Sequence, residues 1–138
     1  MRALQSVTLA VLIVSQPFLL SACKSHVPAT ITMSPQTPLK ANAGIFLRAT
    51  AQPERIAESL RNAGLRSTDR LSDADYTLDV RVGRSRSSGW CGDVRNVVYI
   101  LSSLERRLMV IKGRGPTGTC TPNIFDDLSQ SLARFAVN

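Results

Sequence analysis

The chain has 138 residues, which fits one domain of ordinary size and excludes a multi-domain enzyme. Hydrophobic residues make up 43% and charged residues 20%, proportions that argue against a disordered polyelectrolyte. The formal net charge is +7, and the single histidine, His26, lies close to the N-terminus. We therefore expect no histidine chemistry within the folded domain.

Residues 1–22 have the pattern of an export signal. Arg2 gives a positive start, an apolar run covers residues 9–14, and Phe18, Leu19 and Leu20 extend it towards small residues. The apolar stretch is too short and too interrupted for a membrane-spanning helix, which needs about 20 continuous apolar residues. The segment is therefore predicted to direct export and not to span the bilayer.

The string Leu20-Ser21-Ala22-Cys23 resembles the lipobox of bacterial lipoproteins, in which an aliphatic residue and two small residues precede a cysteine. The resemblance implies cleavage after residue 22 and attachment of diacylglycerol and a further acyl chain, such as palmitate, to Cys23. One acyl chain holds a protein only marginally, whereas three make attachment effectively permanent. This covalent lipid is the only non-protein group we expect, and the alternative is an ordinary cleaved signal that leaves Cys23 as a free thiol.

Lys24 stands where an aspartate favours retention in the inner membrane of Gram-negative bacteria. By that resemblance we expect an outer-membrane lipoprotein whose domain lies in the periplasm.

The remaining cysteines, Cys91 and Cys120, form an even pair once Cys23 is assigned to the lipid. In an oxidising compartment a disulfide is the default, and it would stabilise the fold by roughly 3–4 kcal/mol in the loop-entropy model. The alternative is a two-cysteine metal site, but no further cysteine or domain histidine completes one. We expect the disulfide and no metal.

Residues 23–42 are predicted to be a lipidated N-terminus and a disordered, proline-rich tether. Pro28, Pro35 and Pro38 favour extended conformations, and we find no hydrophobic periodicity there. A spacer over residues 24–42 could hold the domain up to about 55 Å from the bilayer. His26 lies inside this tether, and we assign it no role.

The domain, residues 43–138, is predicted to begin with a short strand over 44–49. Pro53 then starts an amphipathic helix that continues to Ala63. Gly64 is a suitable residue to end that helix, and a short strand over 65–68 follows.

From Tyr76 to Val82 apolar and polar residues alternate, which indicates a strand with one dry face. Residues 85–93, rich in serine and glycine, are expected to form a loop. Strands are predicted over 96–101 and 108–111, the second ended by Gly113, and a last amphipathic helix over 124–137.

These elements predict an α+β fold: a two-layer sandwich with a mostly antiparallel sheet of 3–5 strands and two helices on one face. The expected order is β-α-(β)-β-β-β-α. In such a meander the segments that hold Cys91 and Cys120 lie at one end of the sheet, which independently favours their pairing. We expect Trp90 to pack against that disulfide; the alternative is an exposed anchor for a partner.

The string Ala74-Asp75-Tyr76-Thr77-Leu78, between a helix and a meander, resembles the small α/β domains of several envelope lipoproteins. These include the lipopolysaccharide-assembly lipoprotein, auxiliary lipoproteins of ABC-type envelope transporters and domains like the amino-terminal part of TolB. The resemblance implies a non-enzymatic accessory role in assembly, scaffolding or transport. It transfers no binding residue to this chain.

Positive charge is concentrated in the predicted meander, because residues 81–114 carry the same net charge, +6, as residues 23–138 together. Arginine is suited to bidentate contacts with phosphates and carboxylates. The candidate anion-binding residues are Arg81, Arg84, Arg86, Arg95, Arg106, Arg107, Lys112 and Arg114. The alternative is that these charges only prevent aggregation between sheet edges.

No motif completes a catalytic site, since the glycine-rich residues 113–118 lack the Gly-Lys-Ser/Thr ending of a phosphate loop. Asp126 and Asp127 are interpreted as charges at a helix N-terminus. We expect an outer-membrane-anchored, non-enzymatic accessory or scaffold protein of an envelope assembly, secretion or transport system, with an envelope protein as partner. One alternative is a binder of an anionic glycolipid or polymer, such as lipopolysaccharide, and another is a small inhibitor of a cell-wall hydrolase. Nucleic acid is not an expected partner, because it is improbable outside the cytoplasm.

Overall fold

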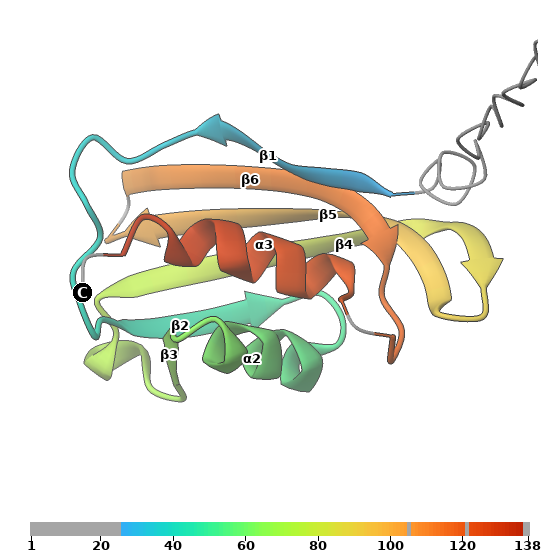
Figure 1. The fold of residues 1–138 in the computed structure, drawn as a ribbon. Coiled ribbons are helices and arrows are strands. Elements are labelled where there is room, and N and C mark those ends of the chain that lie inside the picture. The colour runs from blue at the N-terminus through green and yellow to red at the C-terminus, as the bar shows by residue number, and fades with distance from the viewer. Residues whose placement is uncertain (1–25, 105, 121, 137–138) are drawn as a thin grey trace, which may run out of the picture.

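A computed structural model describes residues 26–104, 106–120 and 122–136, and within them a six-stranded sheet and two helices form two layers (Figure 1). The predicted α+β class is confirmed, as is the order of elements from residue 44 onward. The elements are β1 (Val27–Met33), β2 (Gly44–Ala49), α2 (Pro53–Asn62), β3 (Arg66–Thr68), a 3-10 turn (Leu71–Asp73), β4 (Tyr76–Gly89), β5 (Gly92–Ser103), β6 (Arg106–Pro116) and α3 (Ile124–Ala133). The predicted export signal, the predicted lipobox and Cys23 lie outside the described residues.

The strand order is β1-β6-β5-β4-β2-β3, so β1 and β3 are the edges of the sheet. Strands β4, β5 and β6 form the expected antiparallel meander, and β1 pairs antiparallel with β6. Strand β2 is parallel to β3, because α2 carries the chain back before β3 begins. It is also parallel to β4, which the chain reaches from β3 through the 3-10 turn.

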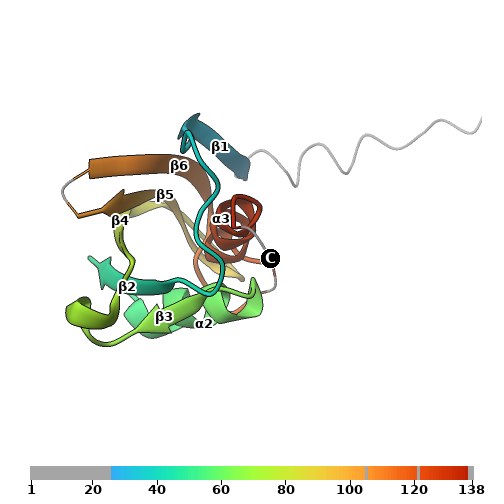
Figure 2. The same ribbon diagram turned by 90° about the vertical axis from the view of Figure 1, so that its left-hand side faces the viewer.

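Both helices pack on the same face of the sheet, which curves so that α3 lies on its concave side (Figure 2). Ile56 and Leu60 of α2 and Phe125, Leu128 and Leu132 of α3 have no exposed surface. The predicted amphipathic stripes are therefore confirmed. The sheet contributes alternate residues to this core, namely Leu78, Val80, Val97, Tyr99, Leu101, Met109 and Ile111.

The helix ends follow from local sequence. Gly64 adopts φ +84° just after α2, where a left-handed residue is needed, and the Leu65 N–H donates to the Leu60 carbonyl at 2.9 Å. At the start of α3, Asn123 and Asp126 each accept the other's backbone N–H in a capping box. The predicted role of Asp126 at the helix N-terminus is thus confirmed.

The predicted tether is wrong for much of its length, because residues 27–33 form strand β1. Valine, isoleucine and threonine favour strands, and Pro28 is tolerated because β1 lies at an edge of the sheet. Leu39, also within the predicted tether, is only 4% exposed, and its N–H donates to the Phe135 carbonyl. The folded body therefore begins before residue 43.

The predicted loop over residues 85–93 is also wrong. Strand β4 continues to Gly89 and β5 begins at Gly92, so the two strands form a long hairpin closed by Trp90 and Cys91. Gly92 adopts φ +95°, which the tight turn requires. With β1 and β3 included, the sheet has six strands where 3–5 were predicted.

Gly113 does not end β6 as predicted, and the strand continues to Pro116. The glycine is needed for close packing, since a Cβ atom on Gly113 would lie 2.7 Å from Cδ1 of Ile124 in α3. Helix α3 itself stops at Ala133, four residues before the predicted end. Ala136 instead forms a bridge with Leu39.

Neither described helix is long and apolar enough to cross a membrane.

Candidate functional site

The sheet surface opposite the helices, here called the outer face, brings together three of the predicted anion-binding residues. Arg81 of β4 lies opposite Val98 of β5, which in turn lies opposite Lys112 of β6. Arg114 follows two residues after Lys112 and therefore lies on the same side of the sheet. Residues directly opposite each other share one side of a sheet, and the alternate residues Val97 and Ile111 belong to the core. We call Arg81, Lys112 and Arg114 the basic face.

The basic face is compact and accessible. Strands lie about 4.8 Å apart, so the Cα atoms of Arg81 and Lys112 are separated by roughly 10 Å, and those of Lys112 and Arg114 by roughly 7 Å. Arg81 and Lys112 are exposed and Arg114 is half-buried. This spacing allows one ligand that carries several anionic groups to contact all three side chains.

Within the described residues, no carboxylate lies within 4 Å of a cationic nitrogen of the basic face. The next row of the outer face contains Asp79, but this carboxylate lies 3.0 Å from Nε of Arg48. The positive charge of the basic face is therefore not neutralised by this neighbouring acid.

The other predicted residues lie elsewhere. Arg95 is engaged inside the protein: one Nη donates to the Gly83 carbonyl at 3.0 Å and the other lies 3.1 Å from Asp93. Hydrogen bonds from Ser88 and Arg95 hold the pKa of Asp93 below its usual range. Arg95 therefore fixes the β4–β5 hairpin, and this use could not be read from the sequence.

The remaining exposed arginines of the set, apart from Arg81, are divided between the two ends of the sheet. Arg84 and Arg86 lie in the distal part of β4, whereas Arg106 and Arg107 begin β6 at the opposite end. The structure therefore distributes the set over the basic face, the distal part of β4 and the start of β6, and it uses Arg95 in an internal ion pair.

The Cys91–Cys120 disulfide is confirmed, with a Cα–Cα distance of 5.1 Å and an S–S distance of 2.12 Å. It joins the tip of the β4–β5 hairpin to the segment between β6 and α3. Trp90, however, does not pack against it, because the Trp90 side chain is 97% exposed. The expectation that Trp90 covers the disulfide is therefore wrong.

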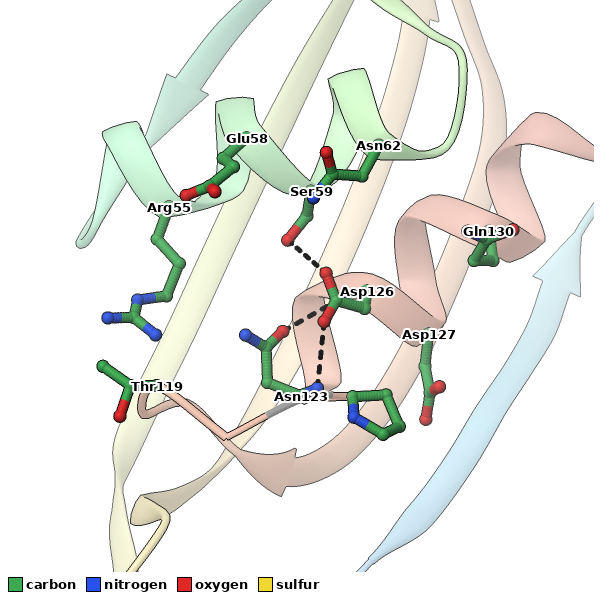
Figure 3. Close-up of a pocket in the computed structure, with 10 residues that line it drawn as sticks. Arg55, Glu58, Ser59, Asn62, Thr119, Asn123, Asp126, Asp127 and Gln130 are labelled. Atoms are coloured by element: carbon green, nitrogen blue, oxygen red, sulfur yellow. Dashed lines mark hydrogen bonds between the residues drawn. The ribbon is translucent and has the colours of Figure 1, made fainter.

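A polar cleft of about 340 Å³ between α2 and α3 was not predicted (Figure 3). Its residues come from α2 on one side and from α3 with the loop before it on the other, and these two parts are far apart in the sequence. The capping-box pattern around Asn123 was the only local signal. The lining residues are Arg55, Glu58, Ser59, Asn62, Thr119, Pro122, Asn123, Asp126, Asp127 and Gln130.

Several polar groups of this cleft are used to hold the protein together. Figure 3 shows the Ser59 hydroxyl directed at Asp126, to which it donates at 2.8 Å. Arg55 donates to the Gly118 carbonyl. Among the residues that the structure describes, no group of three or more metal-ligating side chains occurs. These hydrogen bonds join α2 to α3 and to the loop before α3 across the cleft.

His26 has a place that the sequence did not reveal. Its Nε2 lies 2.8 Å from the Asp127 carboxylate in the first turn of α3, and its ring covers Gly115, where a Cβ would lie 2.7 Å from Nδ1. The histidine assigned to a disordered tether is therefore packed on the folded body. The expectation of a domain without histidine is wrong.

No protein-family model and no curated protein matches this chain. Among solved structures, it is similar to a PelC dodecamer from Paraburkholderia phytofirmans, with a TM-score of 0.46 and 16% identity over 78% of this chain and 94% of that one. A variant of that PelC protein gives a TM-score of 0.45 with 17% identity, covering 78% and 93% of the two chains. A minor lipoprotein from Acinetobacter baumannii gives 0.34 with 14% identity, covering 67% and 91%.

Proposed function

We propose that the protein is a lipid-anchored accessory protein of the bacterial envelope, and that it binds a polyanionic partner through the basic face rather than catalysing a reaction. The partner carries phosphate or carboxylate groups, as an anionic glycolipid or an acidic polymer does. One observation carries the proposal: the basic face lies on inner strands of the sheet, and none of its cationic nitrogens is within 4 Å of a carboxylate of the described residues.

This position separates binding from the alternative explanation of the charge. Charges that prevent aggregation are needed at sheet edges, where unpaired backbone groups are exposed. Lys112 and Arg114 lie where β6 pairs with both β1 and β5. Arg81 pairs with β5 and directly follows Val80, the last residue of β4 that pairs with β2. Strand β1, which is an edge, has no charged residue. Edge protection therefore does not account for the basic face.

The chemistry of the basic face suits a ligand with repeated anionic groups. Arginine forms bidentate hydrogen bonds with phosphates and carboxylates, whereas lysine contributes a point charge. Val98 lies between Arg81 and Lys112, so an apolar side chain separates the cations. Such a surface favours a partner that also has apolar or sugar-ring groups between its charges.

The anchor and the location belong to the proposal as well. The string that ends at Cys23 resembles a lipobox, which supports acyl chains on the first residue of the mature protein, and Lys24 at the next position supports an outer-membrane location. The domain would then meet its partner at the periplasmic surface of that membrane.

Binding to lipopolysaccharide and to inorganic polyphosphate tests the proposal and distinguishes a glycolipid from a plain polyanion. The test variant replaces the basic face: Arg81→Ser, Lys112→Ser and Arg114→Ser. A control removes the same number of charges from exposed positions elsewhere: Arg61→Ser, Arg70→Ser and Arg134→Ser.

At about 1 kcal/mol per cation near an anionic surface, the test variant should bind roughly 100-fold more weakly at low salt. The control should bind nearly as the unmodified protein does, and salt should weaken all binding. Equal loss in both variants would show that only net charge matters, and would overturn the proposed site.

A further inference from the structure

The start of the folded body lies close to the proposed lipid anchor. His26 is held by Asp127 and Gly115, and β1 begins at the next residue. Three residue steps separate His26 from Cys23, and a fully extended chain covers at most about 11 Å in three steps. The end of the sheet that contains His26 must therefore lie near the bilayer if Cys23 carries the lipid.

The tip of the β4–β5 hairpin lies at this same end of the sheet (Figure 1). Val27 lies opposite Arg114, and Arg114 lies opposite Asn96. From Asn96 to Gly92, strand β5 extends four residues further in the direction of the tip, roughly 13 Å. The tip thus extends roughly 13 Å past the start of β1, and the chain from His26 to Cys23 can span at most about 11 Å. Because these two lengths are similar, the tip can reach the bilayer that holds the Cys23 lipid.

The side chains at the tip have the character of a membrane-contact surface. Trp90 is 97% exposed and has an indole that prefers the interface between lipid and water. Arg86 and Arg84 are exposed on the same hairpin, three and five residues before β4 ends at Gly89, which is roughly 10 and 17 Å along the strand. Their long side chains can bind lipid phosphates. We call Arg84, Arg86 and Trp90 the tip surface.

The tip is also fixed to the folded body. The disulfide from Cys91 holds it to Cys120, and the backbones of Gly92 and Gly118 are in such close contact that a Cβ on Gly92 would lie 2.6 Å from Cα of Gly118. The tip surface is therefore presented in one orientation, which reduces the entropy lost on binding.

We propose that the tip surface docks on the headgroup region of the leaflet that holds the Cys23 lipid, with anionic lipids as its partner. This inference rests on the lipid anchor of the proposed function but not on the basic face. The sheet then rises from the bilayer, and the β5–β6 hairpin at the other end stands roughly 40 Å away, the length of β5.

Tryptophan fluorescence tests this directly, because Trp90 is the single tryptophan of the chain. The full-length protein is exported in a bacterial host, checked for acylation of Cys23 by mass spectrometry, and reconstituted into phosphatidylethanolamine–phosphatidylglycerol vesicles. Docking should blue-shift Trp90 emission, because the indole enters a less polar environment. Lipids brominated near the headgroup should quench that emission by roughly two-fold for an indole at the interface. Replacing Arg84 and Arg86 by serine should weaken docking roughly tenfold and make the quenching sensitive to moderate salt.

The matched control moves the reporter to the other hairpin, with Trp90→Phe and Leu104→Trp. Leu104 is also 97% exposed. The emission of the tryptophan introduced at this position should be neither shifted nor quenched. Docking is overturned if Trp90 stays unquenched in acylated protein, if only position 104 is quenched, or if both positions are quenched equally. A protein without acyl chains by mass spectrometry would instead contradict the anchor in the proposed function.

Discussion

Removal of the Cys91–Cys120 disulfide is expected to destabilise the domain by a predictable amount. The two cysteines are 29 residues apart in the sequence. For a closed loop of that size, the loss of unfolded-state entropy corresponds to about 3.6 kcal/mol at 25 °C. This is a large fraction of the roughly 5–15 kcal/mol by which domains are stable. The paired variant Cys91→Ser/Cys120→Ser should therefore remain folded but with a much smaller free energy of unfolding.

Urea unfolding followed by far-ultraviolet circular dichroism measures this difference. Trp90 is already 97% exposed, so its fluorescence is a poor reporter of unfolding in solution. With a urea slope of roughly 2 kcal/mol/M, the midpoint should fall by roughly 2 M. A reducing agent should lower the midpoint of the unmodified protein similarly and leave the variant unchanged. A shift below roughly 0.5 M would refute the loop-entropy argument for this pair.

Three further substitutions test particular contacts. Leu39→Ala should lower the free energy of unfolding in urea by about 2–5 kcal/mol, because Leu39 is 4% exposed and truncation leaves a cavity. If Leu39 belonged to a disordered spacer, the same substitution would leave the free energy of unfolding unchanged. Tyr99→Phe should cost about 1–2 kcal/mol in the same assay, because the buried Tyr99 hydroxyl hydrogen-bonds Ser129 and the Phe125 carbonyl. Asp75→Asn should make the melting temperature of the protein depend less on pH in the acid range. The Gly44 N–H and then Lys40 lower the pKa of Asp75 below 3.8, so its ionised form stabilises the fold above about pH 4, and this is lost as the pH falls through the lowered pKa. Thermal melts between about pH 5 and pH 2 measure that change.

The elements that could be predicted are those whose signal is local. The two helices combine a stripe of apolar residues with residues that define their ends, as Pro53 and Gly64 do for α2. Strand β4 alternates apolar and polar residues from Tyr76 to Val82, and that alternation marks the buried side without reference to any partner. Because these patterns depend only on neighbours in the chain, the α+β class followed from them.

The elements that were missed depend on a partner strand distant in sequence. Strand β1 has exposed apolar residues on an edge and two irregular steps in its register with β6, so its periodicity is weak. The serine-rich half of β4 has few apolar residues, and it is a strand because β5 folds back on it across the Trp90–Cys91 turn. Neither pairing can be deduced without knowing which strand lies alongside.

The same reason limits prediction of the candidate site. Composition identified the arginine-rich region, but the register decides which cations meet. Arg81 and Lys112 are 31 positions apart and lie on either side of Val98 only because β4 and β6 both pair with β5. Arg95, of the same residue type, is held by Asp93 and the Gly83 carbonyl instead. A set of like residues in a sequence thus separates into a binding surface and a structural contact only once the sheet is assembled.

The docked first strand also changes what a lipid anchor would do. A free spacer of 19 residues would let the domain rotate at some distance, so no part of its surface would be selected for the bilayer. With residues 26–33 fixed to β6 and α3, at most about 11 Å of chain separates Cys23 from the folded body. If Cys23 is acylated, two surfaces of different orientation would have different roles. The tip surface would face the lipid, and the basic face of β4 and β6, which lies along the strands, would be directed sideways. A polyanion that approaches along the membrane would meet the basic face without competing with the headgroups for the same arginines. Loosening the His26–Asp127 contact should therefore alter the orientation of the domain before it alters its stability.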